Sequence, residues 1–169
     1  MKKKIALIAS ALFVSAVMGA YAEFGIGVQG GYNWGSVGGA ALLLSPNNHL
    51  HFAVGWYAGD GGFNVGVSAD LWALDLRIVS ISDGGLDFYV GPGLFVNVGM
   101  WKQYDEDKGK NVDKLHIAAG GRIPIGVNFR IQRLELFLQA VPAVGLSVTP
   151  TLGLYWGGFG GNIGIRFWL

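Results

Sequence analysis

The sequence contains no cysteine. This excludes a disulfide framework, a thiolate metal site, a cysteine nucleophile and a lipid-modified N-terminal cysteine. After the first twenty residues the chain also lacks any run of about 18 uninterrupted apolar residues, so nothing there can cross a bilayer as a helix. Only five prolines are present, and the 29 glycines show no G-X-Y period. Collagenous and disordered classes are therefore excluded, and 169 residues allow one domain.

Lysine is scarce outside the N-terminus. Three lysines occupy positions 2–4, and without them the count of 12 basic and 11 acidic residues becomes 9 and 11. The slight basicity therefore belongs to the N-terminus and predicts no nucleic-acid partner. No predicted strand carries a lysine, because the remaining four lie at the edges of or within one predicted loop: Lys102, Lys108, Lys110 and Lys114.

The N-terminus has the three parts of a secretory signal peptide. Lysines at positions 2–4 precede an apolar segment at 5–17, and Ala20-Tyr21-Ala22 has the small-x-small pattern of a cleavage site. We therefore expect residues 1–22 to be a cleaved signal peptide and residues 23–169 to form one exported domain.

Apolar residues alternate with small or polar ones along most of the mature chain, which is the pattern of β-strands. They occupy even positions from Leu86 to Met100, odd positions from Leu115 to Ile131, and even positions again from Leu134 to Leu146. Turn residues separate the runs. The pattern predicts eight strands, near 23–32, 36–44, 49–57, 63–80, 86–101, 115–132, 134–148 and 158–169.

The fourth predicted strand changes phase. Its apolar residues stand on odd positions from Phe63 to Leu71 and on even positions from Leu74 to Ile78. One extra residue in a strand exchanges its two faces, so we expect a β-bulge near 72–74. The bulge would place Asp70, Asp75 and Arg77 on the same side.

The residues on the second face decide what the first face touches. That second face is mostly glycine, alanine, serine and asparagine with scattered charges, whereas a soluble barrel has a lysine- and glutamate-rich exterior. We therefore expect an all-β fold, a closed antiparallel transmembrane up-and-down β-barrel of eight strands, whose apolar face meets lipid. Aromatic residues expected on the lipid face, mostly near strand ends, are Phe24, Tyr32, Phe52, Trp56, Phe63, Phe88, Phe129, Phe159 and Phe167.

An eight-stranded barrel is about wide enough for side chains to fill it. Four acidic and four basic residues fall on the inward face, and isolated charges in a narrow lumen would be costly. We expect a lumen charge network that plugs the interior, with a selectivity-lining pore as the alternative. Its members are Asp70, Asp75, Asp87, Glu135, Arg77, Arg122, Arg130 and Arg166.

The last strand ends with apolar residues at alternate positions, Ile163, Ile165, Phe167 and Leu169. This resembles the C-terminal signal by which the barrel assembly machinery recognises outer-membrane barrels, although Leu169 stands where the signal usually has Phe or Trp. With Gly91-Pro92-Gly93 and the segment 121–126, the chain resembles small outer-membrane barrels of spirochaetes and, more broadly, the OmpA, OmpX and OmpW-like superfamily. The resemblance implies location in the bacterial outer membrane and surface exposure. In some members it implies host-factor binding or passage of small apolar molecules.

Three motifs could carry other chemistry. The glycines at 25, 27 and 30 match a dinucleotide fingerprint, but a strand follows where that motif needs a helix. His49 and His51 share one strand face without a third metal ligand. His116 is a candidate for a lipid-modifying enzyme of the outer membrane, but no serine stands at a defined offset. We therefore expect no enzyme activity, no metal and no cofactor.

The longest polar stretch, 102–114, is expected to be an exposed loop. Its candidate binding residues are Tyr104, Asp105, Glu106, Asp107, Lys108 and Lys110. Two functions remain open. One is a barrel that presents surface loops for interaction, with an extracellular or host ligand, or for a structural role. The other is a small channel for solutes or apolar molecules.

Overall fold

The computed structural model of the protein describes residues 23–32, 39–59, 62–105, 109–149 and 152–169. The predicted signal peptide at 1–22 lies outside them. The described residues form antiparallel strands, and they contain no helix long and apolar enough to cross a membrane. The strands are β1 (Gly25–Tyr32), β2 (Gly39–Ser45), β3 (Leu50–Gly59), β4 (Gly62–Leu71), β5 (Leu74–Ile81), β6 (Gly84–Val90), β7 (Gly93–Asp105), β8 (Lys110–Arg122), β9 (Ile125–Ile131), β10 (Leu134–Thr149) and β11 (Gly153–Trp168).

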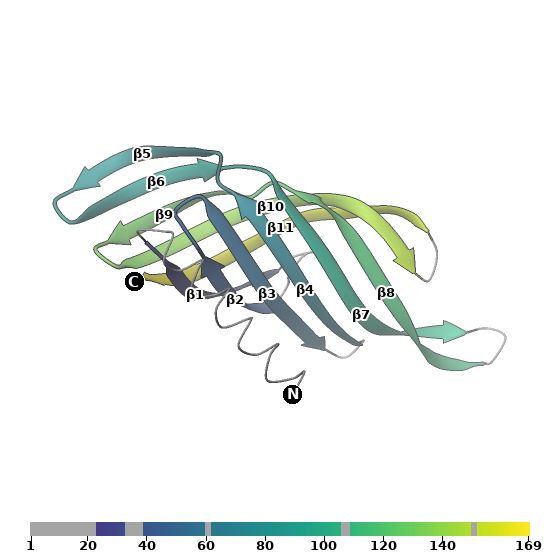
Figure 1. Cartoon of the computed structure of the whole chain (residues 1–169). Helices are drawn as coiled ribbons and strands as arrows, with labels where there is room; N and C mark the ends of the chain where they lie inside the picture. The colour runs from purple at the N-terminus through teal and green to yellow at the C-terminus, as the bar shows by residue number, and fades with distance from the viewer. Residues whose placement is uncertain (1–22, 33–38, 60–61, 106–108, 150–151) are drawn as a thin grey trace, which may run out of the picture.

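Eight of these strands form a ring (Figure 1). The order is β11-β1-β2-β3-β4-β7-β8-β10, and pairing of β10 with β11 joins the two ends. The remaining strands β9, β6 and β5 continue outward from the first half of β10. The predicted all-β, antiparallel fold is confirmed at this level.

The ring is strongly staggered. Following direct cross-strand partners once around it, from Phe167 on β11, leads back to Trp156 on the same strand, 11 residues earlier. One residue of this 11-residue offset arises because the β10–β11 register shifts between Pro142 and Val144. Strands that tilt to close a sheet on itself need such an offset.

Three predicted long strands are each broken in two. The strand expected at 63–80 becomes β4 and β5, that at 86–101 becomes β6 and β7, and that at 115–132 becomes β8 and β9. The breaks lie side by side, because hydrogen bonds join Leu71 N to Pro92 O, Gly91 N to Pro124 O and Ile123 N to Pro142 O.

Proline accounts for two of the three breaks, at Pro92 and Pro124, and the third, at Trp72 and Ala73, lies beside Pro92. A proline has no N–H to donate to the ladder, so regular pairing stops beside it. Gly91 is also required, because a Cβ there would collide with the backbone carbonyl of Leu71. The expected bulge near 72–74 takes the form of the β4–β5 break, where Trp72 turns inward between the exposed residues Leu71 and Leu74.

Two hairpins extend past the ring in opposite directions (Figure 1). The β7–β8 hairpin continues beyond Trp101, the last partner of β4, as far as the pair Asp105 and Lys110. The β5–β6 hairpin continues past the first residue of β3, Leu50, which pairs with Leu71. It extends from the end of the ring where Trp168 pairs with Gly25 near the termini.

Side-chain exposure alternates along the strands in the sense opposite to that of a soluble protein. On β10, Leu138 is 57% exposed while its neighbour Gln139 is 5% exposed. Most of the other ring strands follow this pattern, with large apolar side chains outward and polar side chains buried; the buried Leu43, Phe95 and Phe137 are exceptions. The assignment of the two faces from sequence therefore agrees with the structure.

Outward aromatic residues are mostly where the sequence places them. Phe52, Trp56, Phe63, Phe129, Phe159 and Phe167 are exposed, and Phe88 is half-buried. The prediction for Phe24 is wrong: its side chain is buried. Phe24 precedes β1 and its carbonyl accepts a hydrogen bond from Leu169 N, so the strand alternation does not govern it. The side chain of Tyr32 lies outside the described parts.

Candidate functional site

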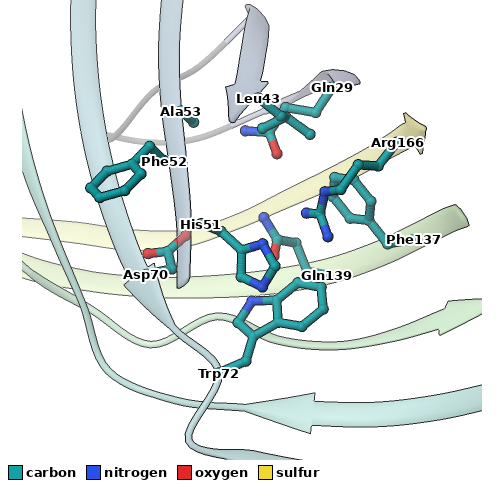
Figure 2. A pocket seen from close by; sticks show the side chains of 10 residues that line it. All are labelled: Gln29, Leu43, His51, Phe52, Ala53, Asp70, Trp72, Phe137, Gln139 and Arg166. Atoms are coloured by element: carbon teal, nitrogen blue, oxygen red, sulfur yellow. The ribbon is translucent and has the colours of Figure 1, made fainter. Parts of the chain in front are cut away.

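The interior of the ring holds the densest set of polar and charged side chains. They come from alternate positions of the ring strands, because successive side chains point to opposite sides of a strand. In Figure 2, residues from β1, β3, β4, β10 and β11 converge with Trp72 on one region of this interior. The buried polar set includes Gln29, His51, Asp70, Asn97, Arg122, Glu135, Gln139, Asn162 and Arg166.

The central ion pair joins the last two strands. Arg166 Nη1 donates to Glu135 Oε1 at 2.8 Å, and both side chains are 2% exposed. Trp168 Nε1 donates to the other carboxylate oxygen, Oε2, at 2.7 Å. The Arg166 guanidinium also lies about 5 Å from the ring centres of Trp72, Phe137 and Trp168. Charge-assisted hydrogen bonds and aromatic faces together offset part of the cost of its removal from water, although its Nε has no hydrogen-bond partner among the described residues.

Aromatic rings stack beside this pair. Trp72 lies between His51, with ring centres 3.8 Å apart, and Tyr89, with ring centres 3.5 Å apart. The Tyr89 hydroxyl donates to Gln139 Oε1 at 3.1 Å. His51 Nε2 donates to the Asn48 carbonyl at 3.1 Å, so Nδ1 can accept the Ser45 hydroxyl at 2.8 Å. The imidazole is satisfied in one neutral tautomer.

Little space remains among these groups. The cavity bounded by Gln29, His51, Asp70, Trp72 and Arg166 has a volume of about 10 Å³ (Figure 2). This is about the volume that one enclosed water needs. The side chains therefore leave room for about one water in this cavity.

The predicted charge network is present in separate pairs. Asp70 lies 2.9 Å from Arg122, and both are buried. Arg77 and Asp87 form an ion pair across the β5–β6 hairpin, outside the ring. With Glu135 and Arg166, three of the four expected acidic residues have an expected basic partner.

Four members of the predicted lumen network lie outside the ring: Arg77 and Asp87, together with Arg130 and Asp75. Arg130 lies 3.0 Å from Glu23 and makes a weaker contact of 3.4 Å with Asn48, at the end of the ring near the termini. The hydrogen bond from Arg130 lowers the pKa of Glu23 below its ordinary value. Asp75 makes no ion pair within the described residues. Its strand, β5, is exposed along its whole length, so this carboxylate can remain hydrated without a partner.

The expected loop at 102–114 is wrong in its bounds. Tyr104 lies on β7, Asp105 ends β7 and Lys110 begins β8, while Glu106, Asp107 and Lys108 fall outside the described residues. Three of the four lysines therefore lie on strands, contrary to the prediction. The reason is that this hairpin continues past the ring, where water reaches it and no apolar alternation is required. Tyr104, Lys102 and Lys110 are exposed.

The other sequence motifs have structural placements. Ile163, Ile165, Phe167 and Leu169 point outward at the end of the chain, the first three on β11 between its partners β1 and β10. The glycines at 25, 27 and 30 lie on β1, which pairs on both sides with other strands. A Cβ at Gly27 would collide with the backbone of Ile165, so close strand approach accounts for one of them.

The histidines take different partners. His49 Nδ1 lies 3.2 Å from the Trp72 carbonyl, and no group of three possible metal ligands occurs in the described part of the chain. His116 Nε2 lies 3.3 Å from Ser147 Oγ, a serine that sequence reasoning did not pair with it. Ser147 Oγ also lies 3.1 Å from the Thr149 carbonyl, which competes for its single proton.

Sequence reasoning missed the aromatic filling of the interior. Trp72, Tyr89 and Trp168 were not recognised as partners of the buried charges, although each is nearly fully buried. For Tyr89 and Trp168 the available signal was their position on the polar side of the alternation. Trp72 lies at the phase change, where the alternation does not predict which face of the sheet its side chain occupies.

A comparison with protein families assigns the chain. It belongs to the family described as "Protein of unknown function (DUF3996)", whose model matches residues 21–167. No curated protein and no solved structure matches it significantly.

Proposed function

We propose that the chain is an integral outer-membrane β-barrel with a filled interior, which presents the β7–β8 hairpin outside the cell for interaction or a structural role. The barrel is the eight-stranded ring, with its apolar side chains in the hydrocarbon. No catalytic step is part of this proposal.

The observation that carries the proposal is the reversed distribution of side chains. Outward leucine, isoleucine, valine and phenylalanine side chains are exposed all around the ring, whereas Glu135, Arg166, Asp70 and Arg122 are buried. In water such an apolar exterior would favour aggregation. In lipid it is the favourable arrangement, provided that the backbone is paired, and the ring pairs its strands with one another.

The outer surface also contains a hollow of about 830 Å³ with apolar walls. Its lining includes Ile26, Val28, Leu42, Val54 and Phe167, from strands β1, β2, β3 and β11. A lipid acyl chain has the shape and chemistry for this hollow. Outer-membrane lipid is therefore the first partner that we assign, and the barrel assembly machinery, which would read the outward residues of β11, is the second.

The connections support one orientation. At the end of the ring where Trp168 pairs with Gly25 the connections are 46–49, 82–83 and 132–133, and at the other end they are 33–38, 60–61, 106–109 and 150–152. The main difference is therefore the long β7–β8 extension at that other end. Barrels of this class have short turns in the periplasm and longer extensions outside. The β7–β8 hairpin, with exposed Lys102, Tyr104 and Lys110, then faces the exterior. An extracellular ligand would meet this hairpin first.

Membrane insertion is tested with the chain lacking residues 1–22, refolded in detergent micelles and in lipid vesicles. We expect heat-modifiable migration on gels, protection of the ring from protease in vesicles, and precipitation when detergent is removed. A folded monomer that stays dissolved in detergent-free buffer would contradict the proposal.

The alternative function is a small channel, and the filled interior argues against it. In planar bilayers the unaltered chain should give no reproducible conductance, since buried side chains such as Trp72, Gln139 and Arg166 crowd the interior around the cavity of about 10 Å³. Trp72→Ala removes the middle ring of the stack and should produce small conductance steps, which makes the silence of the parent interpretable. Steps of equal size from both proteins would favour the channel.

A further inference from the structure

Strand β5 has a free edge. In the described residues it pairs only with β6, and it is the last strand of the sheet at that end. All eight of its residues are exposed, so neither face is covered by another element. An unpaired edge offers a row of backbone donors and acceptors to any strand that can lie beside it.

The edge is apolar, which makes prolonged contact with water unfavourable. Leu74, Leu76 and Ile78 are 43%, 50% and 55% exposed. Natural edge strands that stay unpaired are usually protected by lysine, proline or a charge on the apolar face. Between Leu74 and Ile78 the sequence offers Asp75 and Arg77, which stand on the other face, beside Tyr89 and Asp87.

We propose that β5 pairs with β5 of a second copy, antiparallel and centred on Leu76. A two-fold axis requires this self-complementary kind of contact, in which residue i meets residue j and j meets i. Centring on Leu76 places Asp75 opposite Arg77 of the other copy, and Arg77 opposite its Asp75. The Asp75 carboxylate, which has no ion pair among the described residues of one chain, then has a cation beside it.

Other registers fit worse. Centring on Asp75 sets two carboxylates against each other, and centring on Arg77 sets two guanidinium groups against each other, which is destabilising for directly opposed residues. A shift by one residue pairs the apolar face with the charged one, because side chains alternate with a period of two. The Leu76 register instead sets Leu76 against Leu76 and Leu74 against Ile78.

The β5–β6 register shift agrees with a contact that covers only residues 74–78. The register with β6 shifts between Arg77 and Val79, so the regular part of β5 ends at Arg77 and Ile78 has no direct partner on β6. The proposed contact uses residues 74–78 and stops there. The free edge of β5 and its charges are the same whether or not the ring lies in lipid.

The absence of cysteine allows a direct test by single substitution. Residues directly opposite on antiparallel strands have Cα atoms about 4.5–5.5 Å apart, within the range that a disulfide bridges. In Leu76→Cys the two thiols face each other. In Leu74→Cys or Ile78→Cys alone they are offset by four residues, about 13 Å along the strand, which is too far.

The chain is refolded in detergent micelles and in phosphatidylcholine vesicles, oxidised with copper phenanthroline and run on a non-reducing gel. We expect Leu76→Cys to give at least about tenfold more covalent dimer than either control alone. A mixture of Leu74→Cys and Ile78→Cys chains should form dimer that neither forms by itself. Adding Asp75→Arg to Leu76→Cys should lower the yield several-fold. Heat-modifiable migration checks that each variant is folded.

Equal yields from the three single variants, or a monomeric Leu76→Cys chain, would overturn the pairing. A dimer unaffected by Asp75→Arg would overturn the register. The result is separable from the membrane proposal. A chain that enters vesicles without cross-linking refutes only the pairing, and a chain that cross-links but stays dissolved without detergent refutes only the barrel.

Discussion

The two hairpins that extend beyond the ring both have unpaired strand edges, and they differ in the side chains that those edges carry. Near its tip the β7–β8 hairpin is a ribbon with both edges unpaired in the described residues, and it carries Lys102, Lys110 and Asp113 as exposed charges. The β5–β6 hairpin has one free edge, on β5, and that edge is apolar apart from Asp75, Arg77 and Ser80. Charged side chains protect an unpaired edge in water from pairing with another chain, whereas an unpaired apolar edge is expected to pair with another strand.

The two hairpins also differ in the strands with which they pair. Strand β6 pairs with β5 on one side and with β9 on the other, and β9 in turn pairs with β10. The tip of β7–β8 has only its own two strands. The first hairpin is therefore part of a sheet that includes β10, and the second can be lost without leaving another strand unpaired.

The largest effect is expected where the ring that carries both hairpins is held together. Glu135→Gln leaves Arg166 buried without its anion, and breaking a buried pair in this way costs about 3–5 kcal/mol. We expect the free energy of unfolding in detergent to fall by about this amount. Urea titration followed by tryptophan fluorescence measures it, since Trp72 and Trp168 report on the interior.

The control for this prediction is Arg130→Gln. Arg130 and Glu23 are partly exposed, and surface pairs contribute about 0–1 kcal/mol. The variant should therefore remain close to the parent. Equal losses from both substitutions would mean that burial of the Glu135–Arg166 pair has no special weight, and that the two ends of the ring are equally sensitive.

The Glu135–Arg166 pair shows which part of the site can be predicted from the sequence. Strict alternation placed Glu135 and Arg166 on the polar side of their strands, and the reversed hydropathy of the two faces predicted that this side is interior. The alternation contains no information on which cation meets which carboxylate. Glu135 lies directly opposite Arg166 in the β10–β11 register, and Asp70 and Arg122 both lie opposite Gly93, so these contacts follow from strand registers that the alternation does not give.

A middle-sized effect comes from trimming each hairpin by nearly the same length. One variant joins Leu76 to Phe88 through Asn-Gly, and the other joins Lys102 to Asp113 in the same way; both use directly paired residues. The first removes partners of β9 such as Leu86 and Asp87. We expect it to lose about 1–3 kcal/mol, since cross-strand pairs contribute about 0.2–1 kcal/mol each.

The β7–β8 trim should leave the free energy of unfolding and heat-modifiable migration nearly unchanged. Both quantities are measured side by side in the same detergent. If the β7–β8 trim were the more damaging, the difference drawn between the hairpins would be wrong. That hairpin would then be an integral part of the ring.

The hairpins also mark where sequence prediction fails and why. Polar residues at 102–114 were read as a loop, because alternation predicts a strand only where one face is apolar, and a strand in water needs no such face. The broken strands had a readable signal in Pro92 and Pro124, each lying between two strands, but their alignment with Pro142 requires the register. Likewise, Arg130 was predicted to face Asp or Glu from the strands, whereas its partner Glu23 precedes β1.

The smallest expected effect tests the end of the ring beside the β5–β6 hairpin. The Arg130 hydrogen bond holds the pKa of Glu23 below its ordinary value of 4.5. The ionised form is therefore favoured in the folded chain. Its stabilising contribution is complete above pH 4.5 and is lost as the pH falls through the folded-state pKa.

Glu23→Gln removes this contribution, so the difference in unfolding free energy between parent and variant should shrink as the pH is lowered from 7 to 3. Because both side chains are partly exposed, we expect a few tenths of a kcal/mol at neutral pH, less in high salt. Urea titrations of both proteins at pH 7 and pH 3 measure it. A difference that grows toward low pH would mean that Arg130 does not hold Glu23 as an anion, and that the rim beside β9 is held by the contacts of Arg130 with Asn48 and Trp168 instead.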